Sequence, residues 1–285
     1  MTERPFITIG FSSHRLEVLP EARRVMENHD AIVLEEAPEP DFPRVLAGEM
    51  GIEEYLADKD LEFPRYSRAQ LHLLRDLVRE GKRIFQSEPY LERLIRIHEL
   101  LARGLTRPEV ESRPGLKVVY EAEARASAAL LAFYTRAHSA PFPRVVAAVR
   151  DFAQADAARF RLRDELRARD LLPFLRNFPR LYVEAGYIHL FLLKKLRQLL
   201  AGRAGLRPVF LLAAPSRQAL GRPRPLGPGD LLTLFYIFGL KVKKEKEDLL
   251  AARSLIYIKL LGKEELAPDP GGAGPRPGPA HAPHG

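Results

Sequence analysis

The sequence contains no cysteine among its 285 residues. This absence excludes disulfide bonds, thiolate nucleophiles and metal sites with cysteine ligands. Any bound metal ion would have to be held by His, Asp or Glu side chains. Such ligands suit a divalent Mn, Co, Zn or Fe ion, and composition does not choose among these metals.

Long apolar segments are also missing. No uncharged apolar stretch reaches the roughly eighteen residues that span a bilayer, and the run Leu231–Leu240 is too short. The first residues, Met1–Pro5, lack the apolar core of a signal peptide. These absences predict a cytoplasmic protein with no membrane partner.

The net charge of +8 permits an anionic partner such as nucleic acid. However, the chain contains no Gly-rich phosphate loop, helix-turn-helix pattern or stacked aromatic motif. Much of the Arg excess alternates with Glu and Asp, as in Arg159–Arg169, which is typical of a solvated helix face. The sequence therefore argues against nucleic acid and favours a small-molecule or peptide substrate.

Short apolar runs alternate with helical patterns along most of the chain, which indicates βαβ units and a mainly parallel sheet with flanking helices. We therefore predict the α/β class. The predicted strands are Phe6–Gly10, Ala31–Leu34, Lys82–Gln86, Leu181–Ala185 and Pro208–Ala213. The main predicted helices are Leu19–His29, Ile52–Glu80 with a break at Pro64, Tyr90–Arg103, His189–Ala201, Leu231–Phe238 and Lys246–Leu261.

The middle of the chain, about residues 116–169, shows only helical pattern, with a break at Pro141–Pro143. We expect a helical insertion packed over the sheet, serving either as a lid on the site or as the interface of a homodimer. We predict one domain over residues 1–266. The Pro- and Gly-rich tail at 267–285 is expected to be disordered because it cannot bury apolar surface.

Polar side chains follow four of the predicted strands. His14 comes after the first strand, Glu35 and Glu36 after the second, Glu88 after the third and His189 after the fourth. In open parallel sheets, ligands bind outside the carboxyl ends of the strands. Because adjacent residues of a strand point to opposite faces, we expect at most one of Glu35 and Glu36 to enter the site.

Two of these units have a similar pattern, in which a strand is followed by a Gly, a short spacer and a His. The first unit contains Gly10 and His14, and the second contains Gly186 and His189. Glycine suits a tight turn from strand to helix and a close approach of the backbone. The repetition suggests two related halves that each present one His.

Together, Ile9–His14, Ile32–Pro38 and Gly186–His189 resemble the TraB/Tiki/ChaN/erythromycin-esterase-like superfamily. Members of this family have two Gly-x-x-His motifs, a Glu after the second strand and an Arg on the helix before the second motif. Gly186–His189 matches the second motif directly. The first motif departs from the pattern, because one extra residue separates Gly10 from His14.

The resemblance implies roles for individual residues. The family pattern Glu-x-x-Pro matches Glu35 and Pro38, which favours Glu35 over Glu36, and the family's Arg would be Arg161 or Arg163. The family includes metalloproteases, esterase-like enzymes and iron- or haem-associated proteins, so the resemblance implies hydrolysis as one of several activities.

The first functional hypothesis is a metal-dependent hydrolase of peptide or ester bonds. His14, Glu35 and His189 would hold a divalent metal ion, which would lower the pKa of a bound water. A spare Glu would accept the proton of that water, and an Arg would stabilise the developing oxyanion. The catalytic candidates are Glu36, Glu88, Arg161 and Arg163. The alternatives are a metal-free hydrolase with a His–Glu pair and a non-catalytic module that binds a ligand or a metal.

Overall fold

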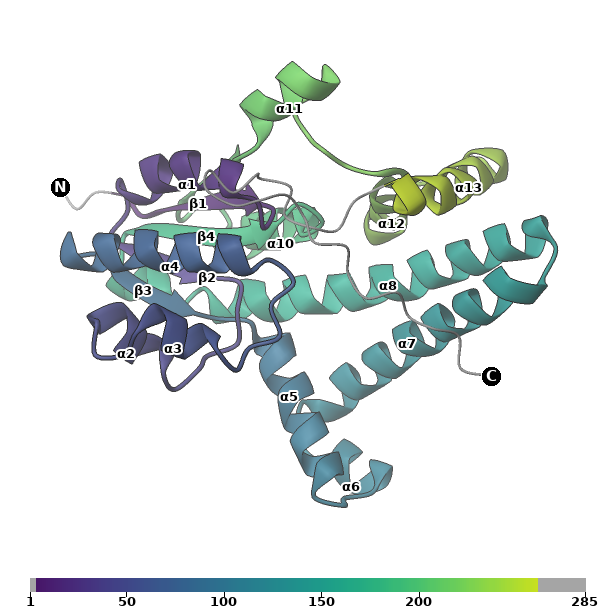
Figure 1. The fold of residues 1–285 in the computed structure, drawn as a ribbon, viewed down its shortest axis with the longest axis horizontal. Helices are drawn as coiled ribbons and strands as arrows, with labels where there is room; N and C mark the ends of the chain where they lie inside the picture. The colour runs from purple at the N-terminus through teal and green to yellow at the C-terminus, as the bar shows by residue number, and fades with distance from the viewer. Residues whose placement is uncertain (1–3, 261–285) are drawn as a thin grey trace, which may run out of the picture.

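Within residues 4–260, which the computed structural model describes, five strands form one parallel sheet (Figure 1). The order across the sheet is β3-β2-β4-β1-β5. The strands are β1 (Phe6–Ser12), β2 (Ala31–Leu34), β3 (Arg83–Gln86), β4 (Arg180–Gly186) and β5 (Gly205–Phe210). This arrangement confirms the predicted α/β class with a mainly parallel sheet.

The fifth strand begins and ends earlier than the sequence predicted. We expected Pro208–Ala213, whereas β5 covers Gly205–Phe210, and Ala213 already begins a helix. Proline cannot donate a backbone hydrogen bond, so it is tolerated in strands mainly at a sheet edge. Pro208 satisfies this rule, because β5 is an edge strand that pairs with β1.

Helices of the first half of the chain cover one face of the sheet. Apolar side chains from these helices pack with Ile32 and Leu34 of β2 and with Tyr182 of β4. The helices are α1 (Leu19–Met26), α2 (Phe42–Ala47), α3 (Ile52–Leu56) and α4 (Pro64–Arg79). The predicted break at Pro64 is confirmed, since Pro64 is the first residue of α4.

The other face of the sheet is covered by α10 (Leu190–Leu200) and by the end of α8 (Phe142–Asp170). Alternate strand residues, such as Val33 and Val183, point to this face and pack with Leu196 of α10. Both faces of the central strands are therefore buried, which explains why these strands read as continuous apolar runs.

Gly10 lies inside β1 rather than at a turn, because β1 continues to Ser12. A Cβ atom added at Gly10 would lie 2.0 Å from the hydroxyl oxygen of the buried Tyr182. The prediction that Gly10 forms a tight strand-to-helix turn is therefore wrong. The expected close approach is correct, and the missing Cβ makes room for the ring of Tyr182.

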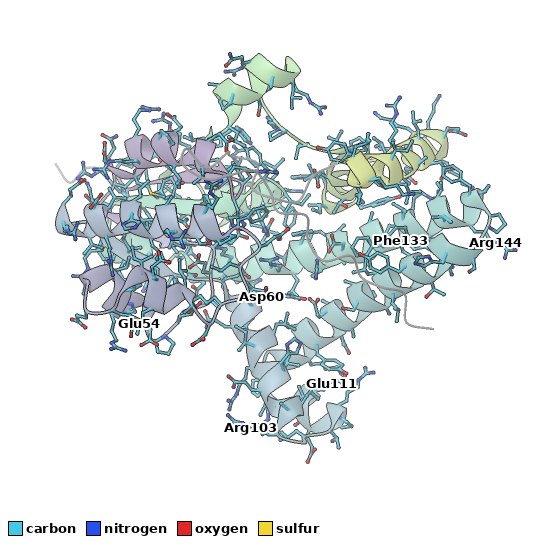
Figure 2. The ribbon with its side chains drawn as sticks, in the orientation of Figure 1. Glu54, Asp60, Arg103, Glu111, Phe133 and Arg144 are labelled. Carbon is cyan, nitrogen blue, oxygen red and sulfur yellow. The ribbon has the colours of Figure 1, made fainter. Side chains whose placement is uncertain are left out.

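The helical middle of the chain forms a long antiparallel hairpin of α7 (Leu116–Ser139) and α8, which projects away from the sheet (Figure 1). The predicted break near Pro141 is confirmed, because α8 begins at Phe142. Figure 2 labels Phe133 and Arg144 towards the outer end of this hairpin, far from the strands. The expectation that the insertion packs over the sheet is correct only for the last turns of α8, where Ala168 joins the core.

Several further helices surround this frame. The chain between β3 and α7 forms α5 (Pro89–Ala102) and the short α6 (Arg107–Glu111), and α9 (Phe174–Asn177) precedes β4. After β5 come α11 (Ala213–Leu220), α12 (Pro228–Phe238) and α13 (Lys244–Leu260), of which α12 and α13 pack on α8. Of the helices in residues 4–260, none combines the length and apolar character needed to cross a bilayer. The predicted tail at 267–285 lies outside the described residues.

Candidate functional site

A cavity of about 600 Å³ opens at the carboxyl ends of the strands. This volume is typical of small-molecule sites in proteins. The lining contains residues from β1, β4, α4, α5 and α8, together with the segments that follow β1, β2 and β4. The structure brings five of the residues that the sequence singled out to this cavity: His14, Glu35, Glu36, Arg163 and His189.

His189, which caps the start of α10, lies between two carboxylates and is only 4% exposed. Its Nδ1–H donates to Oδ1 of Asp164, and its Nε2–H donates to Oε1 of Glu35 at 2.7 Å. Burial alone would lower the pKa of His189, but the charges of Glu35 and Asp164 outweigh burial and raise it to about 9. His189 is therefore an imidazolium at neutral pH.

Glu35 accepts hydrogen bonds from several directions. Its Oε2 accepts the backbone N–H of Gly186 at 2.6 Å. Arg163 Nη2 and Arg167 Nη1 each lie 3.6 Å from one oxygen of this carboxylate. Burial alone would raise the pKa of Glu35, but the charges of His189, Arg167 and Arg163 hold it well below its usual range. Glu35 is therefore ionised and paired at neutral pH.

Glu184, which the sequence analysis did not single out, also lines the cavity. It lies inside β4, and its Oε1 accepts hydrogen bonds from the Tyr66 hydroxyl and from Nε2 of Gln70, both at 3.2 Å. Burial, together with the nearby charges of Glu36 and Glu35, raises the pKa of Glu184 to about 7. The cavity therefore contains a carboxyl group that changes its protonation state near neutral pH.

Glu35 and Glu36 both line the cavity, contrary to the expectation that only one of them would. The expectation assumed the alternation of an extended strand, but β2 ends at Leu34 and both residues lie in the following bend. Glu36 accepts a hydrogen bond from Nε2 of Gln86 at 2.7 Å. The resemblance favoured Glu35, and Glu35 is the residue in contact with His189.

Arg163 lines the cavity, whereas Arg161 is exposed and does not. The structure therefore distinguishes Arg163 from Arg161 as the candidate site residue, which the spacing in the sequence could not do. Glu88 also stays outside the cavity lining: its carboxylate is fully buried, 3.6 Å from Nε of Arg163. The expectation that Glu88 accepts a proton from water in the site does not agree with this position. Burial raises the pKa of Glu88 above its usual value.

One face of α8 carries four residues of the site at helical spacing, namely Phe160, Arg163, Asp164 and Arg167. Asp164 accepts the backbone N–H of Leu192 at 2.9 Å in addition to the His189 ring. Arg167 is 1% exposed. Sequence reasoning missed Asp164 and Arg167 because it read the charges of this helix as a solvated face.

His14 lines the cavity from the segment after β1, where its ring lies 5.2 Å from that of Tyr66 between ring centroids. The proposed equivalence of the two Gly–His units does not hold in the sheet. Gly186 is the last residue of β4 and pairs with Ser12, whereas Gly10 lies two residues deeper. The first motif thus differs from the second in two ways: it has one extra residue, and its glycine lies within a strand instead of at the end of one.

The side chains at this site are a poor fit for a divalent metal ion. In the described part of the chain, residues 4–260, no group of three or more His, Asp and Glu side chains could hold one, so His14, Glu35 and His189 do not form a shared coordination sphere. Two guanidinium groups flank Glu35, and these positive charges would repel a metal cation. Both ring nitrogens of His189 already contact carboxylates.

Comparison with known proteins gives one informative match. An uncharacterized protein of Archaeoglobus fulgidus is 30% identical over 263 residues, which cover 92% of this chain and 86% of the archaeal protein. No family model matches the chain, and no solved structure matches it. The extent and identity of this match show that the chain belongs to the same protein family as the uncharacterized archaeal protein.

Proposed function

We propose that the protein is a hydrolase of ester or peptide bonds that acts through Glu184, His189 and Arg163. The observation that carries this proposal is the pairing of two titratable groups in one cavity. The pKa of Glu184 is raised to about 7 and that of His189 to about 9. Groups whose environments separate their pKa values in this way are suited to act as base and acid.

Glu184 serves as the general base. Its carboxylate accepts a proton from a water molecule in the cavity, and the water oxygen forms a bond to the carbonyl carbon of the substrate. A base is most effective when its pKa lies near the working pH, because it is then both ionised and basic. Hydrogen bonds from Tyr66 and Gln70 fix the direction of this carboxylate.

Arg163 and the imidazolium of His189 stabilise the negative charge that develops on the carbonyl oxygen. The substrate then replaces Glu35 as the acceptor of the His189 Nε2–H, and this proton passes to the leaving oxygen or nitrogen as the carbonyl–heteroatom bond breaks. Glu184 returns its proton to solvent, and His189 takes one up, which restores both groups. Asp164 keeps the imidazole ring oriented throughout.

The metal-dependent version of this reaction, with Mn, Co, Zn or Fe at His14, Glu35 and His189, stays a prediction of the sequence, as does the link to the TraB/Tiki/ChaN superfamily. Cytoplasmic location and a homodimer also stay predictions. The side chains described above fit a metal ion poorly, and they therefore favour a reaction that uses protein side chains alone. If the cavity binds ligands but does not convert them, the alternative function applies, and the protein is a non-catalytic binding module.

Two arginines on the same helix provide the test. In Arg163→Gln, kcat for hydrolysis of p-nitrophenyl acetate is expected to fall about 10²- to 10³-fold, because a charge at the oxyanion is lost. Arg161→Gln removes an exposed charge two residues away and should keep the wild-type rate. Equal rates in both variants and the wild type would exclude Arg163 from the reaction, and no hydrolysis by the wild type would exclude ester hydrolysis itself.

A further inference from the structure

A second cavity, of about 420 Å³, adjoins the one that contains Glu184 and His189. Ser13 and Arg15 line both cavities, so the two spaces meet at the segment that follows β1. The second cavity extends from there to Leu212 and to the helices α12 and α13. The proposed function does not use this cavity.

The far part of the second cavity presents mainly apolar surface. Leu212, Tyr257 and Ile258 line it. Two of its polar side chains are engaged within the protein: Asp230 Oδ2 accepts the Gly227 backbone N–H at 2.8 Å, and the Ser254 hydroxyl donates to the Ala251 carbonyl at 2.7 Å. A ligand in this part would therefore gain chiefly from burial of apolar groups.

Arg15 supplies a positive charge at the junction of the two cavities. Its guanidinium carbon lies 5.9 Å from the centroid of the Phe63 ring. Across the described residues, 4–260, no carboxylate forms an ion pair with Arg15. An anionic group of a ligand at the junction would find Arg15 free to bind it.

We infer that the substrate is an amphiphilic anion, whose apolar end lies in the cavity between Leu212 and Ile258 and whose negative charge is held by Arg15. The bond to be hydrolysed then lies in the adjoining cavity beside Glu184 and His189. This location of the reacting bond rests on the proposed function, whereas the binding of the apolar end and the anion does not.

The test measures binding of a series of linear alkyl carboxylates, hexanoate to dodecanoate, to the full-length chain by titration calorimetry below their micelle concentrations. The dissociation constant is expected to fall about two- to fourfold for each added methylene until the second cavity is filled. Arg15→Gln should weaken the whole series about tenfold without changing this dependence on chain length. Alkylamines of the same lengths should bind far more weakly than the carboxylates.

Two variants fill the second cavity. An added Cβ at Gly229 would meet the nearest atom, Ser254 Cβ, at an ordinary 3.5 Å, so Gly229→Leu is expected to fold and to occupy the cavity. Ile258→Trp changes a residue that is 56% exposed, which gives a second variant of low risk to folding. Both should bind hexanoate but gain nothing from further methylenes. Arg253→Gln, an exposed charge on the same helix as Ile258, should behave as wild type.

The outcomes separate the two proposals. Three results would each overturn the inference. The dissociation constant of the wild type could be independent of alkyl chain length, or the two cavity-filling variants could keep the wild-type dependence on chain length. Alkylamines could also bind as tightly as the carboxylates. Carboxylate binding as expected, with no hydrolysis of p-nitrophenyl acetate, would overturn the proposed function alone. Ester hydrolysis with a flat carboxylate series would overturn the inference alone.

Discussion

The Glu184→Gln variant is expected to be more stable than the wild type at pH 8 and to hydrolyse esters about 10²- to 10⁴-fold more slowly. The folded state raises the pKa of Glu184 from 4.5 to about 7, so ionisation of this buried group opposes folding. Its destabilising effect is absent below pH 4.5, grows as the pH rises through about 7, and reaches about 3 kcal/mol above that pH. Gln removes the ionisation but keeps an oxygen that can accept from Tyr66 and Gln70.

Urea unfolding at pH 4 and pH 8 measures the first effect. The free energy of unfolding of Glu184→Gln should match the wild type at pH 4 and exceed it at pH 8. Glu17→Gln, an exposed carboxyl near His14, is the matched control and should change neither stability nor rate. A Glu184→Gln protein with wild-type activity would remove Glu184 from the mechanism, whatever its stability.

The Asp164→Asn variant is expected to lower both the pKa of His189 and the rate of hydrolysis. The two oxygens of Asp164 accept from the His189 ring and from the Leu192 backbone, and an amide can offer only one acceptor to these two donors. One donor is left unpaired in a buried position, which costs about 1–3 kcal/mol of stability. Because the imidazole also loses its orientation, we expect the rate to fall by about 10²-fold or more.

The decisive measurement for Asp164→Asn is the NMR titration of His189, since a purely structural role would leave its pKa high. In the wild type the titration should occur near pH 9, and in the variant at a lower pH. Asp156→Asn provides the control, because Asp156 is also a buried carboxylate of α8 but pairs with Arg159. An unchanged titration of His189 in Asp164→Asn would contradict the proposed contact.

The sheet and much of the site could be predicted because they depend on local patterns. Strands buried on both faces need continuous apolar runs, and Ala31–Leu34 was predicted with its observed bounds. The carboxyl ends of parallel strands meet at one edge, so His14, Glu35 and His189 were expected near one another and do line one cavity. Pro208 shows the limit of such patterns, since only the pairing partners reveal that its strand lies at an edge.

The residues missed by sequence reasoning depend on tertiary contacts. Glu184 is a single acidic residue within an apolar strand, and this mismatch was the signal that could have identified it. Asp164 and Arg167 lie on a helix rich in charges of both signs, and nothing in the sequence alone marks which face α10 and the sheet will bury. Glu88, by contrast, was expected in the site but does not line the cavity. A position after a strand does not determine whether the side chain points into the cavity.

The proposed hydrolysis is tested most directly by the pH dependence of kcat/KM for ester hydrolysis by the wild-type protein in excess chelator. Activity is expected to persist in chelator, to rise with pH through about 7 as Glu184 ionises, and to fall through about 9 as His189 loses its proton. Activity that disappears in chelator and returns with Mn, Co, Zn or Fe would contradict this expectation and support the metal-dependent hydrolase.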